Sequence, residues 1–433
     1  MDPLPILLEL ARIPTVSDPA RGRLVDESQG RMVADVLARY GLEAELHVDG
    51  GIPTLLAVRG EGRPVTLFMA HFDVVPPGPG WTRDPFNPTV EGDRVYARGA
   101  ADDKSNVAAI TAALAGYEPE KGTIIIAFTG DEEIGGSHGA GWLAGYLERQ
   151  GMLPDYLVNG DGSLSRVITR RRNAFTATIQ VKREPATASG RLLKARFQSR
   201  LQRETMHSAY LVPGVDTHAL VAASLWARDR DTRIASLDGE WVKTNVVPRT
   251  ASIEYVAEGP SSVDYDEALT RLVHAIVPLS RAPIPVEKYS DYGVTVNPNM
   301  YSLDGETHTL KLDIRAMTGD KSRVEAALEN IVEEALPGAR LNVAGGKGYL
   351  YTPASARLVK LAVEANETLG LPGNPIEAGG ASDSRYFSPK GVEAIDYGPL
   401  GGNIHGPDEW VSVTHLRLAA KFYRMIAERL HSE

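Results

Sequence analysis

The chain has 433 residues, of which 43% are hydrophobic and 24% charged, and its formal net charge is −10 at pH 7. This composition is typical of a folded globular protein, and the length exceeds what one hydrophobic core usually supports, so we expect two domains. The acidic balance argues against nucleic acid as a partner, because phosphate binding needs a dominant basic surface. The chain contains no cysteine, so His, Asp and Glu are left to hold any metal ion.

Neither a membrane anchor nor an export signal is expected. No apolar stretch approaches the roughly 18 residues that span a bilayer, and residues 1–6 lack the basic segment and apolar core of a signal peptide. We therefore expect no membrane partner and a cytoplasmic location. The basic run from Arg170 to Arg200 is interpreted as a solvated face with a loop.

The first part of the chain, residues 1–165, alternates helical patterns with short apolar runs. Apolar residues recur at helical spacing near 4–13 and 30–40, and the spacing predicts a further helix over 103–117. Strands are predicted at 54–58, 65–70, 123–128 and 156–158. Such alternation indicates a mainly parallel sheet with helices on both faces, the α/β class.

The pattern changes between residues 166 and 348. Apolar and polar residues alternate along 174–181 and 310–315, which favours antiparallel strands with one solvated face. Helices are predicted at 216–227, 264–277 and 321–335, and a strand, turn and helix recur in 251–277 and 310–335. This alternation predicts an inserted α+β domain, a lid or dimerisation-like domain.

Residues 349–433 return to the first pattern. A helix is predicted at 354–369, a buried strand at 392–397 and a terminal helix at 413–430. We therefore predict a catalytic domain made of residues 1–165 and 349–433, interrupted by the insert at 166–348.

Imidazole and carboxylate groups gather after the predicted strands. The candidates are His71, Asp73, Asp102, Glu132, Glu133, Asp161 and His405. Alone, His71 would be interpreted as a structural histidine and Asp131–Glu133 as a solvated loop. Because the carboxyl ends of parallel strands collect active-site residues, their joint placement favours a metal site of hydrolytic type.

These segments resemble the M20 metallopeptidase family, which contains carboxypeptidase G2, carnosinase-like and PepV-type dipeptidases, succinyl-diaminopimelate desuccinylase and acetylornithine deacetylase. The segments that carry the resemblance are 71–76 (HFDVVP), 97–104 (ARGAADDK), 130–135 (GDEEIG), 379–385 (GGASDSR) and 405–409 (HGPDE). Ala97 and Ser105 stand where the family often has glycine, and neither change removes a ligand.

The resemblance implies two divalent metal ions per chain, zinc or alternatively manganese or cobalt. Asp102 would bridge both ions, His71 and Asp161 would hold one, and Glu133 and His405 the other.

The resemblance also implies the proton chemistry. Glu132 would be the general base that takes a proton from the water shared by the two ions and passes it to the leaving amine. Asp73 would orient His71 through its second ring nitrogen.

Further residues resemble family positions that face the substrate. His207 resembles the histidine that stabilises the tetrahedral oxyanion, although it also suits a surface position before a helix. Arg315 resembles the arginine offered to a substrate carboxylate, a bidentate task that suits a guanidinium, although it also suits a solvated face. Asn245 and Arg385 are the other substrate-binding candidates.

The leading hypothesis is a dipeptidase that cleaves short peptides with a free C-terminal carboxylate. Asp103 after the bridging aspartate and the large insert resemble the PepV-type and carnosinase-like dipeptidases. The alternative is an N-acyl-amino-acid deacylase, which would use the same site and chemistry on another substrate. A catalytically silent binding or scaffold protein is a third hypothesis, and the intact set of candidate metal ligands and Glu132 argues against it. The expected partner is a small peptide or acyl amino acid, and the chain is either a monomer or a homodimer.

Overall fold

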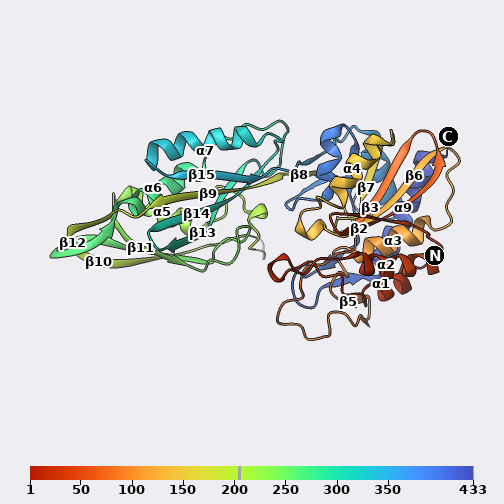
Figure 1. The fold of residues 1–433 in the computed structure, drawn as a ribbon, viewed down its shortest axis with the longest axis horizontal. Coiled ribbons are helices and arrows are strands. Elements are labelled where there is room, and N and C mark those ends of the chain that lie inside the picture. Colours follow the sequence, from red (N-terminus) through yellow and green to blue (C-terminus); the bar gives the residue numbers. More distant parts are fainter. Residues whose placement is uncertain (203–205, 433) are drawn as a thin grey trace. The chain divides into compact units, whose positions relative to one another are not determined.

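The computed structural model describes residues 1–202 and 206–432, and the chain divides into two compact units (Figure 1). The first unit contains Met1–Arg171 and Tyr349–Glu433, and the second contains Arg172–Gly348. The predicted boundary at 165/166 lies slightly earlier than the first division. Strand β8 (Ile168–Arg171) accounts for the difference, because it pairs with strands of the first unit.

A central sheet organises the first unit. In spatial order its strands are β1 (Glu45–Asp49), β2 (Ile52–Glu61), β6 (Gly122–Thr129), β3 (Val65–His71), β7 (Tyr156–Asn159), β18 (Glu393–Asp396), β8 and β16 (Leu350–Tyr351), with β17 (Ile376–Ala378) also pairing with β8. The pairs β3–β6, β3–β7, β7–β18 and β8–β17 are parallel, and the others are antiparallel. The predicted α/β fold with a mainly parallel sheet is confirmed.

Side chains of β3 alternate between two apolar cores, and every residue of this strand is buried. Phe68 and Ala70 pack in the core that includes α1 (Pro3–Leu10), α2 (Glu27–Arg39), α3 (Lys104–Leu114), α8 (Arg357–Thr368) and α9 (Val413–His431). Leu67 and Met69 pack in the second core with α4 (Ala140–Arg149). Helices therefore cover both faces of the sheet, which explains why the strand reads as one apolar run.

A small antiparallel sheet completes the first unit. It consists of β19 (Gly401–Gly402), β20 (Trp410–Ser412), β5 (Arg94–Tyr96) and β4 (Thr89–Glu91). It joins the segment before Asp102 to the segment after His405, because Trp410 pairs with Tyr96.

The second unit contains antiparallel sheets, as predicted. One has the order β13 (Thr295–Asp304), β14 (Thr307–Ala316), β9 (Asn173–Lys182) and β15 (Arg340–Gly345), and another has β10 (Pro185–Gln198), β12 (Thr250–Asp266) and β11 (Ile234–Gly239). Helices α5 (Ala219–Asp229), α6 (Glu267–Ser280) and α7 (Lys321–Ala335) share one apolar core with these strands. In β9, Phe175, Ala177 and Ile179 point into that core while alternate residues are more exposed.

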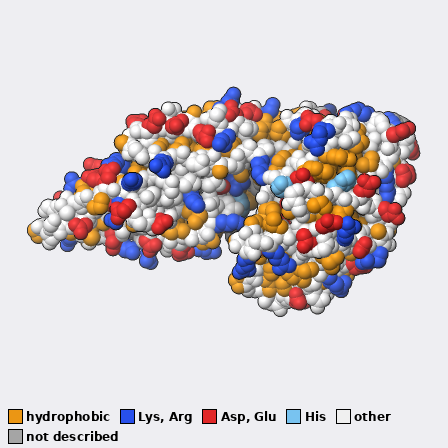
Figure 2. All heavy atoms as spheres, viewed as in Figure 1, with side chains coloured by type: hydrophobic (Ala, Val, Ile, Leu, Met, Phe, Trp, Pro, Cys, Tyr) orange, Lys and Arg blue, Asp and Glu red, His pale blue; other side chains and the backbone are white. Residues whose placement is uncertain are grey.

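Acidic and basic side chains are interspersed over the visible face of each unit (Figure 2). In the part of the chain that the structure describes, no helix has both the length and the apolar character required to cross a bilayer.

Candidate metal centre

Three parallel strands end at the same edge of the central sheet, and a predicted site residue lies at each end. His71 is the last residue of β3, Glu132 lies in the loop after β6, and Asp161 follows β7. Since β3 pairs in parallel with both β6 and β7, the carboxyl ends of the three strands are neighbours. The fold therefore brings these residues to one place, as expected for an α/β sheet.

Asp102 lies between the two predicted histidine ligands. Its Oδ1 is 3.0 Å from Nε2 of His71, and its Oδ2 is 3.1 Å from Nε2 of His405. Nε2 of His405 is also 3.1 Å from Oε1 of Glu133. Ligand atoms of Asp102, Glu133 and His405 all lie within 4.8 Å of one another. A candidate metal site is therefore present, with one oxygen of Asp102 directed to each histidine.

Burial and mutual contacts shift the protonation of this group. Burial alone would raise the pKa of Asp102, but hydrogen bonds to His405 and His71 hold that pKa well below its usual range. Burial alone would lower the pKa of both histidines, yet their carboxylate partners raise it. Burial and the charge of Asp102 raise the pKa of Glu133 to about 7. The protonated forms of His71, His405 and Glu133 are therefore favoured, and bound cations would take the place of those protons.

The chemistry of the donor set fits divalent cations. Burial also raises the pKa of Glu132 and of Asp161, so ionised carboxylates here are costly unless positive charge stands beside them. A bound cation is a strong local charge that favours ionised carboxylates. Imidazole nitrogen and carboxylate oxygen suit zinc, manganese and cobalt, so the residues present fit the predicted ions.

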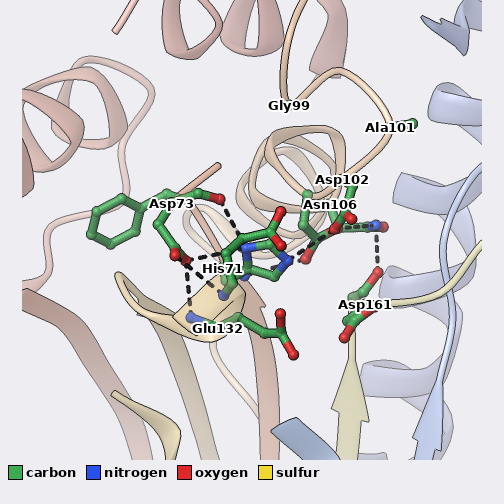
Figure 3. A network of polar contacts seen from close by, with 12 residues as sticks. His71, Asp73, Gly99, Ala101, Asp102, Asn106, Glu132 and Asp161 are labelled. Carbon is green, nitrogen blue, oxygen red and sulfur yellow. Dashed lines mark hydrogen bonds and ion pairs between the residues drawn. The ribbon is translucent and has the colours of Figure 1, made fainter. Parts of the chain in front are cut away.

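Asp73 contacts both His71 and the loop that carries Glu132 (Figure 3). Nδ1 of His71 is 3.0 Å from the backbone oxygen of Asp73 and 3.3 Å from its carboxylate. That carboxylate also accepts the backbone N–H groups of Glu132 and Glu133, at 3.0 and 3.3 Å, and the hydroxyl of Ser17 at 3.0 Å. These contacts fit the predicted orienting role and add a second task, because Asp73 also fixes the glutamate loop.

Asp161 lies beside Arg171, a buried arginine at the end of β8. The carboxylate of Asp161 lies 3.5 Å from Nη2 of Arg171, and Nε of the same guanidinium forms an ion pair with Asp396. Asn106 in α3 donates to the carbonyl of Gly160 at 2.5 Å and so fixes the adjoining backbone (Figure 3). Among the described residues, the cluster of ligand atoms that lie within 4.8 Å of one another does not include the carboxylate of Asp161. The ligand role of Asp161 therefore stays a prediction.

Arg385 lies beside the predicted general base. Its Nη1 is 3.8 Å from Oε1 of Glu132, and its Nη2 donates to Asp383 Oδ1 at 3.0 Å. Burial raises the pKa of Glu132, and the charge of Arg385 opposes that rise. The guanidinium therefore limits the rise in the pKa of Glu132, and the base role of Glu132 and a contact of Arg385 with substrate stay predictions.

The other three predicted residues lie in the second unit and are connected there. Nδ2 of Asn245 is 3.4 Å from Nε2 of His207. The backbone carbonyl of Asn245 accepts the N–H of Ser208 at 2.9 Å. The hydroxyl of Ser208 donates to Asp313 at 2.6 Å, and the guanidinium of Arg315 donates twice to Asp313, at 3.1 and 3.0 Å. The fold thus gathers His207, Asn245 and Arg315, and Arg315 is buried against Asp313.

Three residues that the sequence did not predict support the centre, namely Ser17, Arg171 and Glu409. The carboxylate of Glu409 accepts the backbone N–H of Asp102 at 3.0 Å and pairs with Arg98. The available signal was an acidic residue inside the segment that contains His405. The pairing of Glu409 with Arg98 could not be inferred, since these two residues are 311 positions apart.

Comparison with known proteins identifies the family. The model of peptidase family M20/M25/M40 matches residues 67–429. The chain belongs to this family. The resemblance noted in the sequence is therefore confirmed, and this M20/M25/M40 member is an enzyme, a hydrolase of a peptidase family.

Curated relatives of this family member include succinyl-diaminopimelate desuccinylases. The Zymomonas mobilis enzyme is 26% identical over 406 residues, covering 90% of each chain. The Xylella fastidiosa (strain M23) enzyme is 28% identical over 414 residues, covering 93% of each chain.

Solved structures with a similar fold include two dipeptidases. The aminoacylhistidine dipeptidase of Vibrio alginolyticus has a TM-score of 0.73 at 18% identity, covering 99% of this chain and 96% of that one. Human carnosine dipeptidase 1 has a TM-score of 0.59 at 19% identity, covering 98% and 96%. At these identities the likeness concerns the fold.

Proposed function

We propose that this M20/M25/M40 member is a metal-dependent dipeptidase that hydrolyses the amide bond of short peptides with a free C-terminal carboxylate. The observation that carries the proposal is Asp102 lying between His71 and His405, with Oδ–Nε2 distances of 3.0 and 3.1 Å. A carboxylate shared in this way suits a pair of cations, and the buried acid Glu132 lies in the adjoining loop.

Five side chains would hold two divalent ions. Asp102 would be shared, His71 and Asp161 would hold one ion, and Glu133 and His405 the other. When bound, such ions supply Lewis acidity that polarises the scissile carbonyl and makes water a stronger acid. The carbonyl oxygen and carboxylate of Asp73 keep the ring of His71 aimed at Asp102, since they contact its Nδ1.

Glu132 is the proposed general base. It would accept a proton from the attacking water at its carboxylate and deliver that proton to the nitrogen of the leaving amine. Burial raises its pKa, which brings a carboxyl group nearer to the range in which it both accepts and returns a proton at neutral pH. Arg385, 3.8 Å away, would limit that rise.

Polar side chains of the second unit are proposed to bind the substrate and to stabilise the transition state. The imidazole of His207 would donate to the developing oxyanion, a task worth about 2.7–4 kcal/mol in other hydrolases. Arg315 and Asn245 would bind the substrate carboxylate, and Arg385 is a further candidate for that contact. The large insert, which is part of the fold shared with the Vibrio dipeptidase over 99% of this chain, supports a dipeptidase architecture.

An N-acyl-amino-acid deacylase is the second candidate. It is favoured by the desuccinylase relatives at 26–28% identity, and it uses the same acid–base and metal chemistry. The two candidates differ in the acyl side of the amide, which carries a free amine in a dipeptide and an acyl group such as acetyl or succinyl, without that amine, in an N-acyl amino acid.

A substrate panel tests the choice between them. Purified protein is freed of metal with a chelator, reloaded with Zn²⁺, Mn²⁺ or Co²⁺, and assayed on dipeptides, their C-terminal amides, and N-acetyl or N-succinyl amino acids. We expect two ions per chain and cleavage of dipeptides, with the amides hydrolysed far more slowly. Cleavage of acylated amino acids alone would show that the dipeptidase proposal is wrong.

A further inference from the structure

Glu409 is a fully buried carboxylate that lies four positions after His405 in the chain. Its Oε1 accepts the backbone N–H groups of Ala101 at 2.8 Å and Asp102 at 3.0 Å, and its Oε2 accepts that of Gly99 at 3.2 Å. Three amides of the loop that ends at Asp102 therefore converge on one side chain. Neither this loop nor the segment around His405 lies in a helix at these positions.

Arg98 completes the arrangement as the counter-ion of Glu409. Its guanidinium is 1% exposed and forms an ion pair with Oε2. Nη2 of the same guanidinium donates to the carbonyls of Gly406 and Pro77, both at 3.2 Å. Since a buried ion pair is costly unless its remaining groups are also hydrogen-bonded, these two bonds reduce the cost of burying the guanidinium.

The contacts fix two chain segments that are distant in sequence. Oε1 sets the direction of the Asp102 backbone, and the Asp102 side chain then reaches His71 with one oxygen and His405 with the other. The link from Arg98 to Gly406 fixes the residue after His405. One carboxylate therefore joins the loop of the shared aspartate to the segment that carries a histidine ligand.

We propose that Glu409 is a positioning residue for the metal centre, which holds Asp102 and His405 in register for the two cations. The inference rests on the proposed metal-dependent function and adds a residue that would contact neither ion nor substrate. Residues that orient metal ligands typically change metal affinity by 10–100-fold when they are altered.

The test replaces Glu409 with Gln and uses the neighbouring residue as a matched control. Glu409→Gln keeps the size of the side chain but removes the charge opposite Arg98 and directs an amide N–H₂ at donors. Asp408→Asn makes the same chemical change at a half-buried carboxylate, which accepts the backbone N–H and the hydroxyl of Thr82 at 3.0 and 2.7 Å. Metal-free wild type and both variants are titrated with Co²⁺, and the visible absorption of the bound ion is recorded.

We expect Glu409→Gln to lower Co²⁺ affinity by about 10–100-fold and to alter the absorption bands, while far-UV circular dichroism shows a folded chain. Asp408→Asn should match the wild type. Glu409→Asp keeps the charge with a shorter reach and should fall between the two. It becomes the deciding variant if Glu409→Gln does not fold.

Wild-type affinity and an unchanged spectrum in Glu409→Gln, or in Glu409→Asp where that variant decides, would overturn the proposal. If the wild-type protein itself binds no Co²⁺, the proposed metal-dependent function fails, and this inference fails with it. The two failures are distinguishable because the first requires normal binding by the wild type.

Discussion

The two groups of predicted functional residues balance their buried charges in different ways. In the second unit, the carboxylate of Asp313 is paired with Arg315 two residues away, at 3.0 and 3.1 Å. It also accepts a hydrogen bond from the hydroxyl of Ser208. In the first unit, the acids around Asp102 share their arginines with other acids, since Arg171 also pairs with Asp396 and Arg385 also pairs with Asp383.

The difference indicates where a cation is needed. A pair such as Arg315 and Asp313 is complete within the protein, whereas burial raises the pKa of three acids at the sheet edge, Glu132, Asp161 and Glu133, the last to about 7. Buried acids of that kind are stabilised by a bound cation. The first group therefore suits a metal centre, and the second suits a preorganised polar surface.

The largest expected effect lies at the base. Replacing Glu132 with Gln removes the proton acceptor but leaves the neighbouring ligands in place, so kcat should fall by about 10²–10⁴-fold. Metal content, measured by elemental analysis, should be unchanged. A variant that loses its metal ions as well would mean that Glu132 is itself a ligand and that the two glutamates have been assigned wrongly.

Arg315 tests whether the second group is complete by itself. Arg315→Ala leaves Asp313 buried with one hydroxyl partner, and breaking a buried ion pair typically costs about 3–5 kcal/mol. We expect a lower thermal unfolding midpoint, measured by calorimetry. Arg323→Ala, which removes an exposed pair with Asp320 in α7, is the control and should leave the midpoint unchanged. An unchanged midpoint would contradict this expectation, and a raised KM in Arg315→Ala would support the proposed contact with the substrate carboxylate.

His207 tests whether the second unit takes part in the chemistry. His207→Ala should lower kcat by about 10²–10³-fold, by analogy with other oxyanion donors, without changing metal content or KM by a similar factor. Steady-state kinetics at saturating metal would check this. A kcat equal to that of the wild type would restrict the chemistry to residues of the first unit.

Metal affinity should rise with pH, and this is the smallest of the four effects. In the metal-free protein the raised pKa values of His71 and His405, and the value of about 7 for Glu133, mean that protons occupy the ligands at neutral pH. Cations bind the deprotonated forms, so binding releases protons and the apparent affinity should increase by about tenfold or more per pH unit between pH 6 and 7. Zn²⁺ titration calorimetry in buffers of different ionisation enthalpy measures the protons directly. Affinity that is independent of pH would contradict these shifts.

Strongly periodic segments of the fold could be predicted from the sequence. Residues 321–335 form α7 over the predicted range, because apolar spacing and the cap at Asp320 act within a few residues. Helix α4 was not predicted, since Gly141 and Gly145 weaken the local preference and only packing against the sheet stabilises it. Strand β10 was also not predicted, because its pattern is mostly exposed and its partner β12 supplies the order.

What the sequence determined by itself is the chemistry available to this M20/M25/M40 member: histidine and acid donors in glycine-rich segments after apolar runs, in a chain without cysteine. Side-chain identity and short-range spacing are local properties, and they are sufficient for that conclusion. Only the tertiary structure decided how the donors meet. Asp102 lies between two histidines, Glu409 accepts the backbone N–H of Asp102, and Arg385 lies beside Glu132. Those contacts join residues up to hundreds of positions apart, and the direction of a buried side chain depends on neighbours that local sequence does not specify.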